Sequence, residues 1–110
     1  MAAALQDSVE RRDNRRIPMS LETSLHFSSV LLLNCSTRDV SLDGVFVETR
    51  GEVLPQAAIV EVGIVVHSNG EVRRTRLPAQ VVRIAEDGIA LRFRYPDYIG
   101  YSTLVDLIYP

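Results

Sequence analysis

Residues 58–84 read AIVEVGIVVHSNGEVRRTRLPAQVVRI, and the class of fold follows from this stretch. From Ala58 to His67, one set of alternate side chains is wholly apolar, a period of two that is typical of a strand with one buried face. Asn69-Gly70 then predicts a tight hairpin, because a type I′ turn needs positive φ at both central residues. Val72 to Ile84 is therefore the expected return strand, with Pro78 at a bulge or an edge position.

Alternation of apolar and polar residues also predicts strands on both sides of this hairpin. Upstream, Leu21 to Cys35 is expected to be one long strand. From Val30 this segment is apolar on both faces, so its second half is expected to be buried on both sides. Downstream, Ile89 to Tyr95 is the most regular amphipathic strand of the chain. Turn-forming residues and one short strand complete the pattern, with turns over 36–44, 51–55 and 87–88 and a strand over 45–49.

The C-terminal segment has a helical pattern instead. Pro96-Asp97 interrupts the preceding strand, and Asp97 is placed to cap a helix from about Tyr98 to Ile108. Tyr101 and Leu104 fall on the same stripe of that helix as Ile108. Because a glycine lies within the helix and lowers its intrinsic stability, we expect the helix to depend on packing against the domain.

These elements predict an all-β fold, a small antiparallel six-stranded Greek-key-like β-barrel with a C-terminal helix. Strands and helices do not alternate, which argues against a parallel sheet. A chain of 110 residues is long enough for one domain with a core and too short for two. We expect residues 1–10 to form a flexible N-terminal tail and residues 11–110 to form the barrel domain, with an arginine-rich arm over residues 11–18.

Bulk composition argues against several classes of function. The formal net charge is -2, whereas proteins that bind nucleic acid polymers usually have a basic surface. Cys35 is the single cysteine, which excludes an intramolecular disulfide and favours a reducing compartment. The first residues do not resemble a signal peptide, and the aliphatic run over residues 30–33 is too short to span a bilayer. The sequence therefore predicts a cytoplasmic protein that binds neither a nucleic acid polymer nor a membrane.

Positive charge is concentrated in one segment, Arg11-Arg12-Asp13-Asn14-Arg15-Arg16, immediately before Ile17-Pro18. Arginine stays ionised and carries a planar fork of donors that suits phosphates and the acceptor edge of guanine. A second polar cluster, Asp39-Val40-Ser41-Leu42-Asp43-Gly44, lies in a predicted turn. We interpret the two clusters as two sides of one anion-binding site. The alternative for the first cluster is a solvated N-terminal run of charge.

Together the two clusters resemble the PilZ family, bacterial domains that bind the second messenger cyclic di-GMP. The family motifs are Arg-x-x-x-Arg ahead of the first strand and [Asp/Asn]-x-Ser-x-x-Gly at a strand-to-strand turn. Residues 12–16 match the first motif and residues 39–44 the second, although Arg11 with Arg15 also fits the first. The resemblance covers nearly the whole chain, and Gly88-Ile89-Ala90 departs from a Gly-x-Gly segment that many members carry. It implies a stand-alone cyclic di-GMP receptor or adaptor that changes its surface for an unidentified downstream protein.

The resemblance also implies the ligand-binding residues, which are Arg11, Arg12, Arg16, Asp39, Ser41 and Gly44. Arg12 and Arg16 would bind phosphate or guanine, and Asp39 would accept hydrogen bonds from the N–H donors of guanine, which favours guanine over adenine. Ser41 would place a hydroxyl near the ligand, and Gly44 would let the backbone approach it closely. Arg11 is expected either to stack on a second ligand molecule or to stay solvated.

Other classes of site have little support in the sequence. His26 and His67 do not lie at metal-ligand spacing, and Ser41 has no base placed to activate it, so we expect no metal, no cofactor and no catalytic residue. Two binding functions remain as alternatives: a PilZ-like protein-interaction module with weak or no nucleotide binding, and a small RNA-binding barrel. The tyrosines and the terminal helix are consistent with a homodimer or with simple closure of the barrel.

Overall fold

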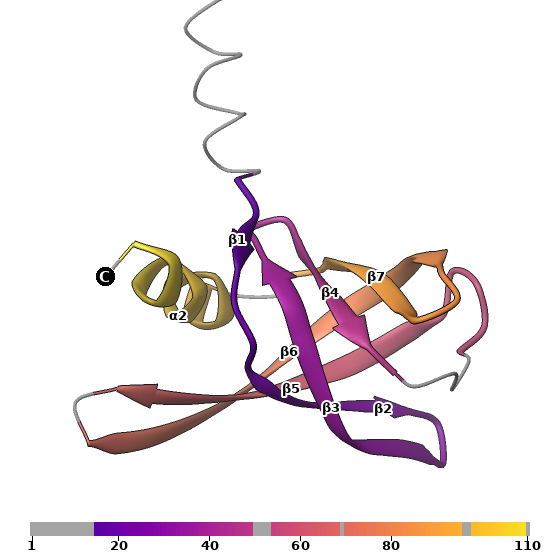
Figure 1. Cartoon of the computed structure of the whole chain (residues 1–110), viewed down its shortest axis with the longest axis horizontal. Helices are drawn as coiled ribbons and strands as arrows, with labels where there is room; N and C mark the ends of the chain where they lie inside the picture. The colour runs from indigo at the N-terminus through magenta and orange to yellow at the C-terminus, as the bar shows by residue number, and fades with distance from the viewer. Residues whose placement is uncertain (1–14, 50–53, 69, 96–97, 110) are drawn as a thin grey trace, which may run out of the picture.

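The computed structural model describes residues 15–49, 54–68, 70–95 and 98–109. This part of the chain forms seven strands and one helix, and Figure 1 shows their arrangement. In chain order they are β1 (Ile17–Pro18), β2 (Glu22–Phe27), β3 (Val30–Val40), β4 (Gly44–Glu48), β5 (Ile59–Ser68), β6 (Glu71–Ile84), β7 (Gly88–Phe93) and α2 (Tyr98–Ile108). The predicted tail over residues 1–10 lies outside the described residues, as do Arg11 and Arg12.

Six of the strands close into a barrel in which all pairings are antiparallel. The hydrogen-bonded order is β3-β2-β5-β6-β7-β4, and β4 pairs again with β3. The short β1 runs beside β3 on the same edge as β2, because β1 and β4 both pair with Val40 from opposite sides. Closure leaves the six strands with few free edges. The predicted fold, an all-β six-stranded barrel with a C-terminal helix, is confirmed.

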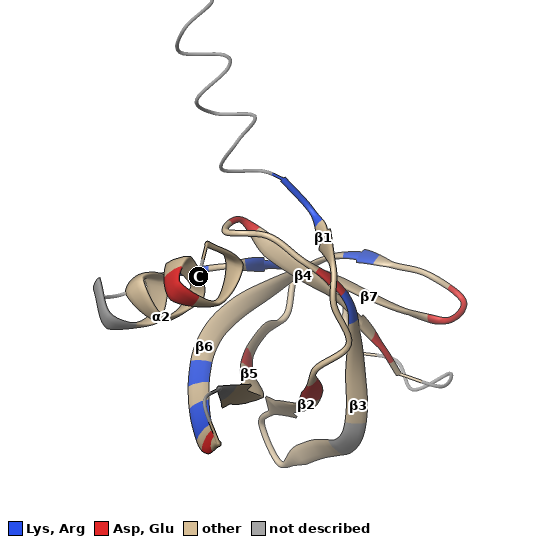
Figure 2. Cartoon of the chain, turned by 60° about the vertical axis from the view of Figure 1, so that its left-hand side comes forward, with Lys and Arg blue, Asp and Glu red and all other residues tan. Residues whose placement is uncertain are grey.

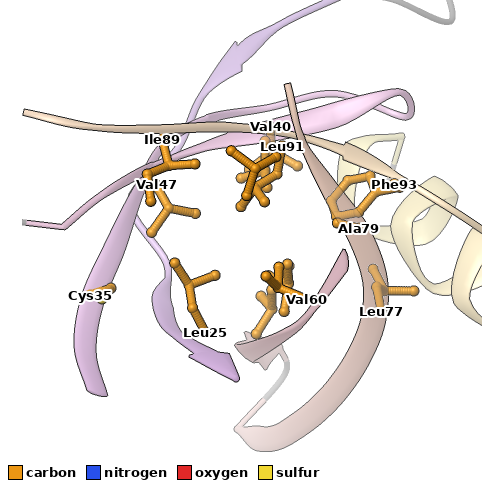
Figure 3. Packing of buried hydrophobic residues seen from close by; sticks show 14 of the residues in the cluster. Leu25, Cys35, Val40, Val47, Val60, Leu77, Ala79, Ile89, Leu91 and Phe93 are labelled. Atoms are coloured by element: carbon orange, nitrogen blue, oxygen red, sulfur yellow. The ribbon is translucent and has the colours of Figure 1, made fainter. Parts of the chain in front are cut away.

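The core consists of side chains that alternate into the barrel, as the period-two pattern requires. Leu25, Val62 and Leu91 are almost completely buried, and they come from three different strands. Figure 3 shows side chains from several strands pointing into this common interior. The helix α2 packs against the barrel and adds Leu104 and Ile108 to the same cluster. No helix in the described ranges is long and apolar enough to cross a membrane.

The predicted long strand over residues 21–35 is wrong. The chain instead turns at Ser28-Ser29, and Phe27 pairs with Val30 across a two-residue loop. Ser28 adopts a φ of 54°, the left-handed conformation that such a turn needs. A Ser-Ser pair is a weak turn signal beside Asn-Gly, which is why the alternation pattern hid this hairpin.

The expectation that the segment from Val30 is buried on both sides is also wrong. Val30 and Leu31 are 45% and 53% exposed, because they lie at the tip of the β2–β3 hairpin. The strand β3 then continues through Val40, so the predicted turn over residues 36–44 shrinks to residues 41–43. A register shift between Thr37 and Asp39 marks a bulge at Arg38 and bends β3 before the turn.

The predicted β5–β6 hairpin and the terminal helix are confirmed. Ser68 pairs with Glu71 across Asn69-Gly70, and Gly70 has a φ of 77°. The bulge in β6 lies between Val81 and Arg83 rather than at Pro78. Pro78 instead stands where the pairing of β6 with β7 ends, an edge position in which its missing N–H costs no ladder hydrogen bond. The predicted helix cap, Asp97, lies outside the described residues.

Candidate functional site

The arm that carries the arginine cluster joins the barrel along the end of β3. Ile17 pairs with Val40 and Pro18 with Asp39, and the backbone N–H of Met19 donates to the Arg38 carbonyl at 3.1 Å. These contacts place the residue before β1, Arg16, beside the last residues of β3. Figure 2 shows this basic segment where it leads into β1.

A buried threonine fixes the gap between β1 and β2. The Thr37 hydroxyl donates to the Met19 carbonyl at 2.5 Å and accepts from the Leu21 N–H at 2.8 Å. The backbone N–H of Thr37 also donates to the Leu21 carbonyl at 3.1 Å. The side chain of Thr37 thus satisfies two main-chain groups that the interrupted pairing leaves open, and it holds the base of the arm.

The two predicted clusters meet at an ion pair. Arg16 Nη1 lies 2.5 Å from Asp39 Oδ1, although the two residues are 23 positions apart in sequence. Their side chains are 53% and 25% exposed, so both groups can be reached by a ligand. Of the four clustered arginines, the structure describes Arg15 and Arg16, and both are exposed. The structure therefore brings together one arginine of the first motif and the aspartate of the second.

The turn after Asp39 is organised by the hydroxyl of Ser41. Ser41 is buried, and its Oγ accepts from the N–H groups of Asp43 and Gly44 at 3.2 and 3.1 Å. It also lies 3.2 Å from the Gly44 carbonyl, to which it can donate. The hydroxyl thus has partners within the turn both as a hydrogen-bond donor and as an acceptor. Ser41 shapes the loop beside Asp39, and a direct ligand contact for it stays a prediction.

Gly44 occupies a position where the barrel has no room for a side chain. A Cβ on Gly44 would lie 2.1 Å from the backbone oxygen of Leu91 in the neighbouring strand β7. Gly44 has no positive φ, so the tight turn does not require glycine for its backbone conformation. The close approach of β7 to the start of β4 is a sufficient reason for glycine here, independent of any ligand.

A tyrosine that the sequence analysis did not single out connects the turn to the helix. The Tyr95 hydroxyl donates to the Leu42 carbonyl at 2.5 Å, in the middle of the Ser41–Asp43 turn. The Tyr95 ring also packs edge-on against Tyr101 of α2, with ring centroids 5.3 Å apart. The only available signal was the apolar end of the 89–95 strand pattern, which does not reveal a hydrogen bond to a loop 53 residues away.

We expect the Tyr95 contact to make stability sensitive to high pH. Burial raises the pKa of Tyr95 well above its usual value, so folding stabilises the neutral phenol. Because the folded pKa is the higher one, this contribution is complete below the unfolded pKa of about 10 and is lost as the pH rises further. Chemical denaturation between pH 8 and about 11 should show a steep loss of stability in the native protein and a shallower loss in Tyr95→Phe. If the unfolding free energy fell equally steeply with pH in both proteins, buried Tyr95 would not be the cause of the loss.

Arg38, the neighbour of Asp39, is engaged elsewhere. Its guanidinium binds Asp87 at 2.5 Å and lies 3.7 Å from Glu48, and it stands 4.3 Å from the centroid of the Phe46 ring. The hydrogen bond between Arg38 and Asp87 lowers the pKa of the Asp87 carboxyl and raises the pKa of Arg38. These side chains are exposed, so the ion pairs contribute little to stability. Through its contact with Asp87, Arg38 links β3 to the turn between β6 and β7.

Within the described ranges, no group of His, Cys, Asp and Glu side chains is arranged to hold a metal ion. The site therefore consists of a guanidinium and a carboxylate on the barrel rim, beside a rigid turn. Such a pair offers hydrogen-bond donors and acceptors side by side, which suits a ligand that presents both.

Comparisons with known proteins concern the family and the fold of the chain. A family model described as PilZ domain matches residues 10–109. The chain is similar to the crystal structure of the PilZ domain of CeSA from a cellulose-synthesizing bacterium, with 18% identity, a TM-score of 0.67, and coverage of 86% of this chain and 95% of that one. It is also similar to an uncharacterized protein of Legionella, with 16% identity, a TM-score of 0.54, and coverage of 86% and 89%. Identities this low show the fold alone. A search of curated proteins gave no significant match.

Proposed function

Because the chain belongs to the PilZ domain family, whose members are generally cyclic di-GMP receptors and act as binding or adaptor modules, we propose that it binds cyclic di-GMP and relays the bound state to a partner protein. The observation that supports this most directly is the contact between Arg16 and Asp39 at 2.5 Å. It unites one residue from each family motif at the rim of the barrel.

The chemistry of this pair suits guanine. One edge of guanine offers the acceptors O6 and N7, which match an arginine fork, and its N–H groups match a carboxylate such as that of Asp39. Adenine carries an amino donor where guanine has O6, so the contact with Arg16 would be lost. The Arg16 side chain is 53% exposed and that of Asp39 is 25% exposed, and the attraction between such partly exposed charges is weak. A bound guanine can therefore replace or join the contact between the two side chains at little cost.

The remaining family residues complete the proposal. Arg12 would supply a second guanidinium for phosphate or base, and Arg11 would either stack on a further ligand molecule or stay solvated. Ser41 and Gly44 would act mainly through the shape of the turn, since the hydroxyl of Ser41 is used within it and Gly44 faces β7. Closing of the arm over the ligand would present a new surface to a downstream protein. No cofactor is needed for any of these steps.

Isothermal titration of the full chain with cyclic di-GMP tests the proposal. We expect a dissociation constant of about 1 μM or lower, because several charge-assisted hydrogen bonds form together. Cyclic di-AMP is the matched control, with the same phosphates and a different base edge, and it should bind at least about 100-fold more weakly. Failure of the native chain to bind cyclic di-GMP would overturn the proposed function. Equal affinity for the two dinucleotides would overturn the guanine contacts.

A further inference from the structure

The hairpin formed by β5 and β6 extends beyond the barrel. The two strands pair from Ile59 with Gln80 to Ser68 with Glu71. The strand β7 pairs with β6 only from Ala79 onward, and β2 pairs with β5 no further than Ile64. Residues 65–68 and 71–74 therefore form a two-stranded extension. We call this extension, together with residues 75–77 of β6, the β5–β6 ribbon. Figure 1 shows the ribbon projecting to the left of the molecule.

One edge of this ribbon offers unpaired backbone groups. In an antiparallel strand, the N–H and C=O of one residue point to the same edge, and alternate residues point to opposite edges. The Pro78 carbonyl accepts from the Arg94 N–H at 2.8 Å, on the side away from β5. Val72, Arg74 and Arg76 share this parity, so their backbone groups also face away from β5. Of the strands in the described ranges, none pairs with β6 on that side before Ala79.

The same edge is basic, although the chain as a whole has a net charge of -2. Arg73, Arg74 and Arg76 are all exposed, and Figure 2 shows this charge along the outer part of β6. Arg74 and Arg76 lie on the outer face together with Val72, which is 54% exposed, and Arg73 lies on the opposite face. Two carboxylates are near: Glu71 follows the turn, and Glu61 lies 3.3 Å from Arg76. Among the residues that the structure describes, no ion pair includes Arg73 or Arg74.

A surface hollow lies over β5, between β2 and the basic residues of β6. It has a volume of about 370 Å³, and its lining includes Ser24, Gly63, Arg74 and Arg76. Gly63 pairs with Ser24 on one side and with Arg76 on the other, so the absence of a side chain at Gly63 opens the floor of the hollow. Glu22 also lines it and places a negative charge on the far wall. The two arginines thus border both the open edge and a cavity large enough for a side chain.

We propose that the open edge of β6 binds an extended acidic segment of a partner protein as an added strand. Strand addition uses backbone hydrogen bonds for affinity and alternate side chains for specificity. An antiparallel segment would place acidic residues opposite Arg76 and Arg74 and an apolar residue opposite Val72, in the order acidic-x-acidic-x-apolar. A second copy of this chain fits poorly, because its own arginines would face these ones. Single-stranded RNA also fits poorly, since the ribbon sequence contains no Phe, Tyr or Trp on which bases stack.

A synthetic peptide with capped ends and the central sequence Glu-Thr-Glu-Thr-Val tests this proposal without cyclic di-GMP, so the result is independent of the proposed function. Titration followed by amide NMR should give a dissociation constant of about 100 μM, with the largest shifts at Val72, Arg74 and Arg76. The control peptide has the same sequence and charge but is N-methylated on alternate backbone amides, which prevents it from pairing as a strand.

Two variants separate the backbone contribution from the charge. Val72→Pro removes an N–H on the open edge and keeps every arginine and every hydrogen bond to β5, so the barrel should fold and the peptide should bind at least about 10-fold more weakly. Arg74→Gln with Arg76→Gln keeps the edge and should weaken binding about 5-fold. Arg73→Gln is the matched control, since it removes one charge from the opposite face, and it should change affinity by less than about 2-fold.

Several outcomes would overturn the inference. Equal binding of the N-methylated peptide would show attraction by charge without strand addition. Tighter binding of a uridine decamer than of the peptide would identify the ribbon as an RNA surface. Dimers of the chain alone that disappear in Val72→Pro would show that a second copy occupies the edge. An absence of peptide binding at about 1 mM would exclude the proposed segment altogether.

Discussion

Replacing Gly44 by alanine is expected to destabilise the barrel by about 3 kcal/mol and to lower its melting temperature by about 15 °C. The added Cβ would lie 2.1 Å from the Leu91 carbonyl oxygen and 3.3 Å from the Arg92 Cα, both of which are backbone atoms of β7. A flexible side chain could move aside, but β7 is held from both sides by β4 and β6. The contact must therefore be relieved by separating β4 from β7, which breaks closure of the barrel. Thermal unfolding of the ligand-free protein measures the effect.

Gly63→Ala is the matched control for Gly44→Ala. Its Cβ would lie 2.5 Å from the Ser24 Oγ, a side-chain atom that can rotate away, so the change in unfolding free energy should stay below about 1 kcal/mol. The comparison also separates two explanations for Gly44. If this glycine served only to let a ligand approach, Gly44→Ala would unfold like the native protein and lose only cyclic di-GMP binding. That result would contradict the explanation that the close approach of β7 leaves no room for a side chain at Gly44.

The parts of the fold that were predicted correctly have strong local signals. Asn69-Gly70 determines a hairpin because few other residue pairs adopt positive φ so easily, and the structure places the turn at those residues. The strand predicted over residues 89–95 forms as β7, although it ends two residues earlier, at Phe93. The pattern after Pro96 gives a helix with the predicted bounds. In each case the information lies within about ten neighbouring residues, which is the range over which periodicity acts.

The features that the sequence analysis missed depend on contacts between distant segments. The Ser28-Ser29 turn is selected by pairing of β2 with β3 rather than by strong turn residues. The bulge at Arg38 keeps Asp39 within a strand, where composition suggested a turn. The hydrogen bond from Tyr95 to Leu42 and the contact of Gly44 with β7 join residues about fifty positions apart. No local pattern encodes such distances, since they follow only from closure of the barrel.

The candidate site was predicted in a different way. Local chemistry identified two polar clusters, and only the resemblance to a family suggested that they meet. The structure brings Arg16 to Asp39, and it turns Ser41 inward to the backbone of its own loop. Residue type alone could not distinguish these two orientations, because Asp39 and Ser41 are both short polar residues beside a turn. Their positions differ because β3 ends at Val40, between them.

Replacing Arg16 by alanine is expected to weaken binding of cyclic di-GMP strongly and to leave the stability of the fold almost unchanged. The ion pair with Asp39 is more than half exposed on the arginine side, so its loss should cost less than about 1 kcal/mol of unfolding free energy. A charge-assisted hydrogen bond to the ligand contributes about 1.5–3 kcal/mol, and an arginine fork can make two of them. Affinity should therefore fall by at least about 100-fold. Thermal unfolding and isothermal titration of the same preparation measure both quantities.

The control for Arg16→Ala is Arg73→Ala, which removes another exposed arginine, from the β5–β6 ribbon, and should leave the affinity for cyclic di-GMP within about 2-fold of the native value. Asp39→Asn adds a second test, because it keeps the size of the side chain and replaces its charged acceptor by an amide. If Asp39 accepts hydrogen bonds from the N–H groups of guanine, this variant should lose more affinity for cyclic di-GMP than for cyclic di-AMP. The ratio of the two affinities should therefore become smaller than in the native protein. Native affinity in Arg16→Ala would place the ligand elsewhere on the barrel. Loss of folding in that variant would instead show that an exposed ion pair, against the physical expectation, holds the arm and the barrel together.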